Sequence, residues 1–578
     1  MYEWEGIAAS SGYALGSAYV LPSALYDTSR RQLEAHEILA EIGRFEAKVE
    51  QAIRDIDLLK SKAVADNKVE QAAIFTTHIS LLRDPEFVGD VTQRIQDEAS
   101  NAEAMLNEVT EELITMFEAM DNEVLKERCS DLRDVSARIG SYLSGEEEKL
   151  QTEFPEPVIM IGVDLAPSLT AKLDVSQVTG FAVDVGGKTS HSAIIARSLG
   201  IPAVVGLKDI SSSIQTGDFI IIDGYRGTVM VNPSSEVIDA YQKLKHDEDA
   251  RLARYEMYRE LPTVTADGIS VQLAINIANP KDAMAVEKVG AEGVGLYRTE
   301  FLFMDRKEMP SEEEQYYAYK AAVTAIGEHG PVIIRTLDVG GDKEIPYLQQ
   351  SKESNPFLGY RAIRLCLGSG NADMFKMQLR AILRASAHGN VKIMYPMIAT
   401  LQELRAANHL LKEAKVELDA MGVSYDDTVE VGIMIEVPAA ALIADQLSKE
   451  VDFFSIGTND LVQYTMAADR MNEQVAYLTQ PLHPAVLRLI DQVIRAAHAQ
   501  NKWVGMCGEM AGHPVAIPIL IGMGLDEFSM SPAALLPARE LISKLNRSEM
   551  VELVRDVLQM ESADEIETYV KSNVLEFE

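Results

Sequence analysis

The chain has 578 residues, too many for a single hydrophobic core, so its length predicts roughly two to four domains. Its formal net charge is −36, which argues against nucleic-acid binding and is compatible with a basic protein partner or simply with solubility. Because the sequence has no apolar run of the ~18–20 residues that cross a bilayer, and no secretory signal at its start, we expect a cytoplasmic protein without membrane contact.

Residues 33–149 show helical periodicity. Apolar residues recur every three or four positions from Ile38 to Leu59, with charged residues between them, and similar stretches cover 71–82, 86–96 and 102–119. The pair Asp84-Pro85 interrupts this pattern, because proline disfavours helix at the preceding residue. We expect a helical hairpin pair or a small bundle over residues 23–146.

The next segment has the alternating strands and helix that are typical of an α/β unit. Short strand-like runs bounded by Gly, Pro or Asp occupy 158–162, 180–184, 219–222 and 228–231, and a helix is predicted over 192–199, stopped by Gly200. Residues 6–22 are also strand-like. We therefore predict an α/β domain made of residues 1–22 and 147–232, with the helical block inserted into it.

A linker helix is predicted over residues 233–262. Its segment 241–260 is rich in charge and has no clear apolar face, which suits an exposed connection between domains.

From residue 263 to residue 578 the sequence alternates strands and helices. Eight candidate strands, separated mostly by helix-length segments, are the number found in a TIM (β/α)8 barrel; they cover 271–276, 293–296, 332–337, 391–395, 431–435, 452–456, 503–507 and 527–530. An open doubly wound sheet is the alternative, but no strand leads into a Gly-x-Gly-x-x-Gly turn that would favour it.

Charged and polar residues follow several of these strands, where the active site of a TIM barrel lies. Arginines, a lysine and carboxylates suit a small ligand that bears both phosphate and carboxylate, since Arg binds such groups in bidentate fashion. Glu436 and Asp460 offer oxygen ligands for Mg²⁺. The three cysteines lie far apart in sequence, so Cys507 at this mouth is a free thiol rather than part of a disulfide framework. The set at the strand ends is Arg298, Arg335, Asp338, Lys343, Glu436, Asp460, Arg470 and Cys507.

A second motif occupies residues 186–197. Two glycines follow a predicted strand and precede Thr-Ser-His at the first turn of a helix, where unpaired N–H groups favour an anion. His191 lies where a phosphate would be stabilised, so its imidazole can attack phosphorus and carry the group covalently. A purely structural histidine is the alternative. The motif is not a Walker A loop, and the chain shows no evident nucleotide site.

Together these stretches resemble enzyme I of the bacterial phosphoenolpyruvate–sugar phosphotransferase system, over essentially the whole chain. Residues 186–197 are similar to the phosphohistidine signature of that family, and residues 452–461 (DFFSIGTNDL) to its second signature. Residues 295–303 (GLYRTEFLF) and 355–361 (NPFLGYR) resemble further stretches of the family.

The resemblance implies a phosphoenolpyruvate–protein phosphotransferase with Mg²⁺ as cofactor. His191 would be phosphorylated at Nε2, and Cys507 would protonate the enolate of pyruvate; Thr170 would lie near His191. Mg²⁺ would be held by Glu436 and Asp460. Phosphoenolpyruvate would be bound by Arg298, Arg335, Lys343, Arg361, Asn459, Asp460 and Arg470.

The resemblance also implies partners. The family forms homodimers through the barrel domain, and its helical insertion docks the phosphocarrier protein HPr. His78, Asp84 and Arg128 match family positions near that interface, whereas Thr76 stands where an acidic residue is expected.

Two further alternatives share this core. An ATP-dependent dikinase or synthase would carry a nucleotide-binding domain before the histidine domain, but the roughly 185 residues before Gly186 are mostly helical. A regulatory paralogue would usually add an N-terminal sensory domain, and none precedes residues 2–22.

Overall fold

The computed structural model describes residues 2–21, 27–65, 69–118, 123–145, 154–165, 177–187, 190–304, 306, 308–341, 345, 347 and 353–575. Two compact units make up the chain, Met1–Arg251 and Leu252–Glu578. Within the described ranges, no helix is both long enough and apolar enough to span a membrane. The predicted domain boundaries at 22–23 and 146–147 lie outside the described residues.

The first unit contains an eight-stranded mixed sheet in the order β1-β8-β7-β3-β4-β5-β6-β2. Strands β3, β4, β5 and β6 are parallel, while β1, β2, β7 and β8 pair antiparallel with their neighbours. The strands are β1 (Tyr2–Glu5), β2 (Ile7–Ser10), β3 (Tyr13–Val20), β4 (Val158–Gly162), β5 (Val178–Val183), β6 (Ala203–Val205), β7 (Phe219–Asp223) and β8 (Thr228–Val231).

Apolar side chains cover both faces of this sheet, which explains the unbroken apolar runs of its central strands. Met160 and Phe181 belong to one buried cluster, and Ile159, Ile161 and Ile222 to another. The helices are α7 (His191–Leu199) and α8 (Ile210–Ser213). Sequence periodicity missed β6 and α8, because runs of three and four residues are too short to show a period.

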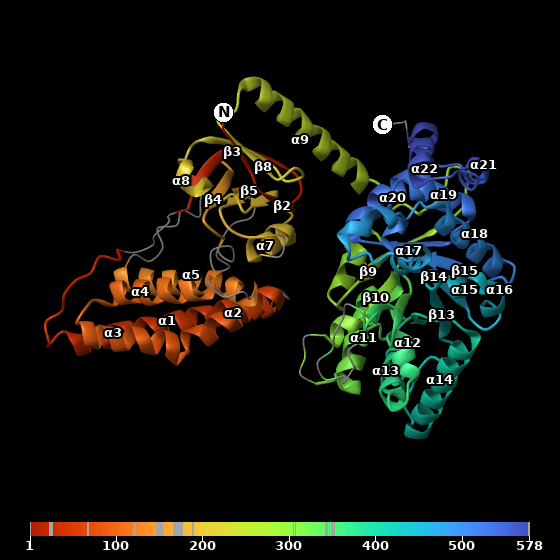
Figure 1. The fold of residues 1–578 in the computed structure, drawn as a ribbon, viewed down its shortest axis with the longest axis horizontal. Helices are drawn as coiled ribbons and strands as arrows, with labels where there is room; N and C mark the ends of the chain where they lie inside the picture. Colours follow the sequence, from red (N-terminus) through yellow and green to blue (C-terminus); the bar gives the residue numbers. More distant parts are fainter. Residues whose placement is uncertain are drawn as a thin grey trace. The chain divides into compact units, whose positions relative to one another are not determined.

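A separate helical segment lies between β3 and β4 along the chain (Figure 1). Its helices are α1 (Ile38–Ala65), α2 (Val69–Leu82), α3 (Asp90–Glu98), α4 (Ala102–Glu118) and α5 (Glu123–Ser144). One buried cluster that includes Phe45, Val91 and Val135 joins them, so the expected bundle is confirmed. The single helix expected over 86–96 is instead a π-helical turn, Pro85–Gly89, followed by α3.

Helix α9 (Ser235–Glu256) lies within residues 233–262, the range predicted for a linker helix. Val237, Ile238 and Tyr241 pack against the sheet, and the Tyr241 hydroxyl donates to Asp223 Oδ2 at 3.1 Å. These apolar residues lie in the first turns of the helix, before most of the charged stretch at 241–260.

The second unit is a closed barrel of eight parallel strands, which excludes the open-sheet alternative. All eight predicted strands are present. They are β9 (Gln272–Ile277), β10 (Val294–Arg298), β11 (Val332–Arg335), β12 (Val391–Tyr395), β13 (Glu430–Ile435), β14 (Phe453–Ile456), β15 (Trp503–Met506) and β16 (Glu527–Met530).

Helices surround the barrel, coloured green to blue in Figure 1. They are α10 (Ala285–Val289), α11 (Glu312–Ile326), α12 (Ala362–Leu367), α13 (Ala372–Ser386), α14 (Leu401–Met421), α15 (Pro438–Leu442), α16 (Ala444–Leu447), α17 (Thr458–Met466), α18 (Pro484–His498), α19 (Ala516–Met523), α20 (Pro532–Lys544), α21 (Arg547–Val557) and α22 (Ala563–Val570).

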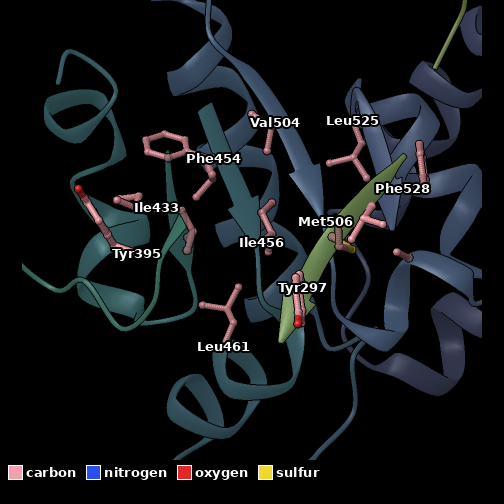
Figure 2. Packing of buried hydrophobic residues seen from close by; sticks show 14 of the residues in the cluster. Tyr297, Tyr395, Ile433, Phe454, Ile456, Leu461, Val504, Met506, Leu525 and Phe528 are labelled. Carbon is pink, nitrogen blue, oxygen red and sulfur yellow. The ribbon is translucent and has the colours of Figure 1, made fainter. Parts of the chain in front are cut away.

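Alternate residues of several barrel strands belong to two different cores. Phe454, Ile456 and Phe528 belong to the large core between strands and helices (Figure 2), whereas Phe453 and Met434 belong to a small cluster inside the barrel. Because side chains alternate along a strand, the interior residues nearest the carboxyl ends open onto the barrel mouth.

Candidate active site

A pocket of about 470 Å³ opens at the carboxyl ends of the barrel strands. It contains the residues predicted from the strand ends that fall within the described part of the chain. Among the residues that line it are Arg298, Arg335, Arg361, Glu436, Asn459, Asp460, Arg470 and Cys507. The expectation that these side chains share one end of the barrel is therefore met.

Two buried arginines on one side of the pocket are cross-linked by acidic side chains. Arg335 lies 2.5 Å from Glu300 Oε1 and 3.0 Å from Asp338 Oδ2, and Asp338 Oδ1 accepts from Arg361 Nη2 at 2.9 Å. Burial alone lowers the pKa of Arg335, but the charges of Glu300, Asp338 and Glu436 outweigh it and raise that pKa. Both guanidinium groups therefore remain charged and are held in place before any ligand arrives.

Asp460 links Arg361 to Arg470. Its Oδ2 lies 3.4 Å from Arg361 Nη2 and its Oδ1 lies 3.3 Å from Arg470 Nη1. Asp460 is in the first turn of α17, directly after β14, so the strand end and the helix start fix its position. Arg470 and Asn459 are partly exposed at the rim.

Glu436 and Asp460 are suitable ligands for a divalent cation. Both carboxylates are buried, follow adjacent strands and line the pocket. Burial, together with the charges of Asp460 and Asp338, raises the pKa of Glu436 to about 8. A cation bound between these oxygens would offset that repulsion, so the donor set fits Mg²⁺.

Cys507 follows β15 and packs inside the barrel beside Leu296, Met434 and Phe453. Its amide donates to Ile456 O at 3.1 Å, which fixes the residue against the end of β14. Burial raises the pKa of the Cys507 thiol to about 11. The thiol therefore keeps its proton at neutral pH, so this side chain offers a proton rather than a thiolate.

The second predicted motif forms the start of α7 in the first unit. His191 is the first residue of that helix, and Ser190 caps it by accepting from the Ala193 amide at 3.4 Å. Ser192 donates to Asp164 and accepts from the Leu165 amide at 3.2 Å, which anchors the first turn to the residues after β4. A Cβ at Gly186 (φ +109°) would lie 2.8 Å from Ser190 Oγ, so only glycine fits there.

Some predicted residues fall outside the described part of the chain. They are Thr170 and Lys343, together with the side chain of His191. The pocket lining also includes apolar residues that the strand-end pattern did not predict, among them Phe301, Met434 and Pro481. Of these, only Met434 had a sequence signal, because it alternates with the outward residues of β13.

The residues predicted near a partner lie in different environments. His78 is only 1% exposed, with Nε2 3.0 Å from Asp131 Oδ1, so any part it has in partner binding would be indirect. Asp84 accepts from the Glu86 amide at 2.9 Å and caps the π-helical turn, while Arg128 on α5 is exposed.

Three family descriptions match successive parts of the chain. "PEP-utilising enzyme, N-terminal" matches residues 5–128, "PEP-utilising enzyme, mobile domain" residues 154–227, and "PEP-utilising enzyme, PEP-binding domain" residues 252–547.

Relatives match over nearly the whole chain. The phosphoenolpyruvate-protein phosphotransferase of Bacillus sp. (strain S) is 52% identical over 98% of this chain and 97% of its own length. Proteins of the same name from Listeria monocytogenes serovar 1/2a and Bacillus subtilis (strain 168) are 48% and 49% identical, each over 99% of this chain and 100% and 99% of their own lengths.

The chain belongs to the phosphoenolpyruvate-protein phosphotransferase family. The resemblance drawn from its motifs is thereby confirmed, and the relatives favour this family over the dikinase alternative. The pocket lies within the part of the chain that matches the PEP-binding domain, and His191 lies within the part that matches the mobile domain.

Proposed function

We propose that this protein transfers the phosphoryl group of phosphoenolpyruvate to its own His191 and then to the histidine of the phosphocarrier protein HPr, releasing pyruvate. The observation that carries the proposal is the pocket at the barrel mouth, where four arginines, five carboxylates and a thiol line one cavity. Phosphate and carboxylate are both anions that guanidinium groups bind in bidentate fashion.

The residues of the pocket take distinct roles in this mechanism. Arg298, Arg335, Lys343, Arg361 and Arg470 bind and orient the phosphate and carboxylate of the donor, with Asn459 as an additional donor of hydrogen bonds. Glu436 and Asp460 would hold Mg²⁺, which when bound would supply a Lewis acid that neutralises charge on the phosphoryl group. Because Arg335, Arg361 and Arg470 are already held by Glu300, Asp338 and Asp460, these three side chains need little reorganisation on binding.

Transfer and proton delivery are assigned to two further side chains. The imidazole Nε2 of His191 attacks phosphorus, the bond from phosphorus to the enol oxygen breaks, and the enolate of pyruvate remains. The Cys507 thiol gives its proton to the methylene carbon of that enolate, which makes pyruvate and drives the transfer forward. Thr170 assists near His191.

The roles of the chain's segments follow from these assignments. Residues 1–22 and 147–232 carry the phosphohistidine, residues 233–262 connect, and residues 263–578 bind the donor and form the homodimer. Residues 23–146 dock HPr, with Asp84 and Arg128 at the interface and His78 behind it. His191 lies in one compact unit and the pocket in the other, so transfer requires an encounter between the units. We place the protein in the cytoplasm.

One incubation tests the proposal. The full chain is mixed with phosphorus-labelled phosphoenolpyruvate, Mg²⁺ and HPr, with and without ATP. We expect label on His191 and then on HPr, with pyruvate released and no requirement for ATP. Label that requires ATP, or that appears on another residue, would contradict the proposal.

A further inference from the structure

We infer that Tyr464 and Phe357 form a clamp that positions two of the pocket's arginines, Arg361 and Arg470, for donor binding. The inference rests on the proposed function, since it concerns the affinity of the same pocket for phosphoenolpyruvate. Tyr464 lies in α17 and Phe357 in the short 3₁₀ turn Pro356–Leu358. Neither is among the residues that line the pocket.

The Tyr464 hydroxyl connects an arginine to a backbone carbonyl. It donates to Phe357 O at 2.6 Å and accepts from Arg361 Nη1 at 2.9 Å. A hydroxyl has one proton, so donation to the carbonyl leaves its lone pairs for the guanidinium. This arrangement fixes the Nη1 side of Arg361, while Asp338 and Asp460 fix the Nη2 side.

The Phe357 ring lies against both arginines. The guanidinium carbon of Arg361 is 5.9 Å from the ring centroid and that of Arg470 is 6.0 Å from it, within the range of a cation–π contact. Phe357 thus ties the buried Arg361 to the partly exposed Arg470. Without the ring, Arg470 would keep its ion pair with Asp460, and the Phe357 contact that it shares with Arg361 would be lost.

The loop after β11 leaves space for this clamp. Cβ atoms built at Gly340 (φ +103°) and Gly341 (φ +74°) would lie 2.5 Å from Arg361 Cβ and 3.0 Å from Phe357 Cδ1. The loop that carries Asp338 therefore packs directly on Arg361 and on Phe357. Since side chains at either glycine would push these residues away, the close contact depends on their absence.

Three variants test the clamp. Tyr464→Phe removes the hydroxyl and keeps the ring, and Phe357→Leu removes the ring and keeps apolar volume; the third is the double variant. We expect each single variant to raise the KM for phosphoenolpyruvate about tenfold, with kcat changed less than about twofold, because the clamp acts before chemistry. The double variant should raise KM by less than the product of the single effects, because both changes release the same arginines.

Tyr360→Phe is the matched control. Tyr360 lies beside Arg361 in the same loop, but its hydroxyl contacts Leu365 O and Asn371 rather than an arginine. Its KM should equal that of the wild type. Equilibrium titration of phosphoenolpyruvate into His191→Ala, with and without Tyr464→Phe, measures donor affinity without turnover and should show the same tenfold difference.

Other results would overturn the clamp. A lower melting temperature with unchanged KM would make both residues merely structural, and multiplicative single effects would make them independent. If the wild type transferred no phosphoryl group from phosphoenolpyruvate, the proposed function itself would fail. A wild type that transfers, with Tyr464→Phe unchanged in KM, would reject only the clamp.

Discussion

The barrel pocket and the first turn of α7 are both polar sites, but they are assembled differently. The pocket's charged groups lie at the ends of five barrel strands, β10, β11, β13, β14 and β15, or in the segments that follow them, and acidic side chains hold the buried arginines from several directions. At α7, the described polar contacts come from short side chains within a few residues of His191, together with Asp164 after β4. The pocket is thus built from long-range ion pairs, whereas the first turn of α7 presents His191 on a local motif.

This difference suggests a division of roles in which the barrel pocket binds the donor and the first turn of α7 carries the acceptor. If the pocket alone binds the donor, then changes at α7 should abolish transfer and leave affinity intact. Changes inside the barrel should alter proton delivery or the stability of the barrel unit. The predictions below test that separation.

His191→Ala should have the largest effect. We expect phosphoryl transfer to fall below about 10⁻⁴ of the wild-type rate, because the acceptor is gone, while the affinity for phosphoenolpyruvate stays unchanged. Label transfer and equilibrium titration measure the two quantities on the same preparation. A loss of donor affinity equal to the loss of transfer would show that the two sites are not separable.

Cys507→Ala should slow turnover about 10²-fold and leave donor affinity within about twofold of the wild type. The proton for the enolate would then have to come from water. Rapid-quench measurement should show that the first phosphorylation of His191 is slowed less than the release of pyruvate. An unchanged steady-state rate would remove Cys507 from the mechanism.

Glu527 offers a test of the barrel interior. It is buried at the start of β16, and neither of its carboxyl oxygens has a hydrogen-bond partner within the described part of the chain. Burial raises the pKa of the Glu527 carboxyl from 4.5 to about 7, and this effect outweighs the charge of Lys392, which lowers that pKa. Between pH 4.5 and pH 7, the folded state holds this proton and the unfolded state does not. The free energy of unfolding of the barrel unit therefore falls by about 3 kcal/mol as the pH rises through this range, and it stays at the lower value above pH 7.

Glu527→Gln should remove that pH dependence. The free energy of unfolding of the variant minus that of the wild type should increase by about 3 kcal/mol from pH 4.5 to pH 8. The wild type loses this stability as Glu527 ionises, whereas the neutral amide has no proton to lose. Urea unfolding at several pH values measures the difference. A difference that does not change with pH would contradict the buried neutral acid.

Ser190→Ala should have the smallest effect. The cap of α7 would lose its side-chain acceptor, which costs about 1 kcal/mol in local stability. Hydrogen exchange at the Ala193 amide should become faster. Ser311→Ala is the matched control, since Ser311 caps α11 in the barrel unit and should leave exchange in α7 unchanged. Faster exchange in α7 in both variants would indicate that the effect is not local.

The comparison of the two sites also shows which features could be predicted from the sequence. The eight barrel strands and the start of α7 show their own period or a contiguous motif, so their positions follow from local patterns. The ion pairs of Glu300 with Arg335 and of Asp338 with Arg361, and the clamp at Tyr464, do not follow from local patterns, because they join residues that lie far apart along the chain. Strand order predicts which residues reach the mouth, but only side-chain packing decides which acid holds which arginine.

The parallel pairing of β3 with β4 restricts how the helical segment can be engineered. Ser17 lies opposite Val158 and Val20 opposite Ile161, so the chain leaves the far end of β3 and must return to the near end of β4. The segment is therefore one large crossover connection, and a two-residue hairpin cannot replace it. A shortened protein without this segment would need a bridge of at least about a dozen residues to keep the two strands in register.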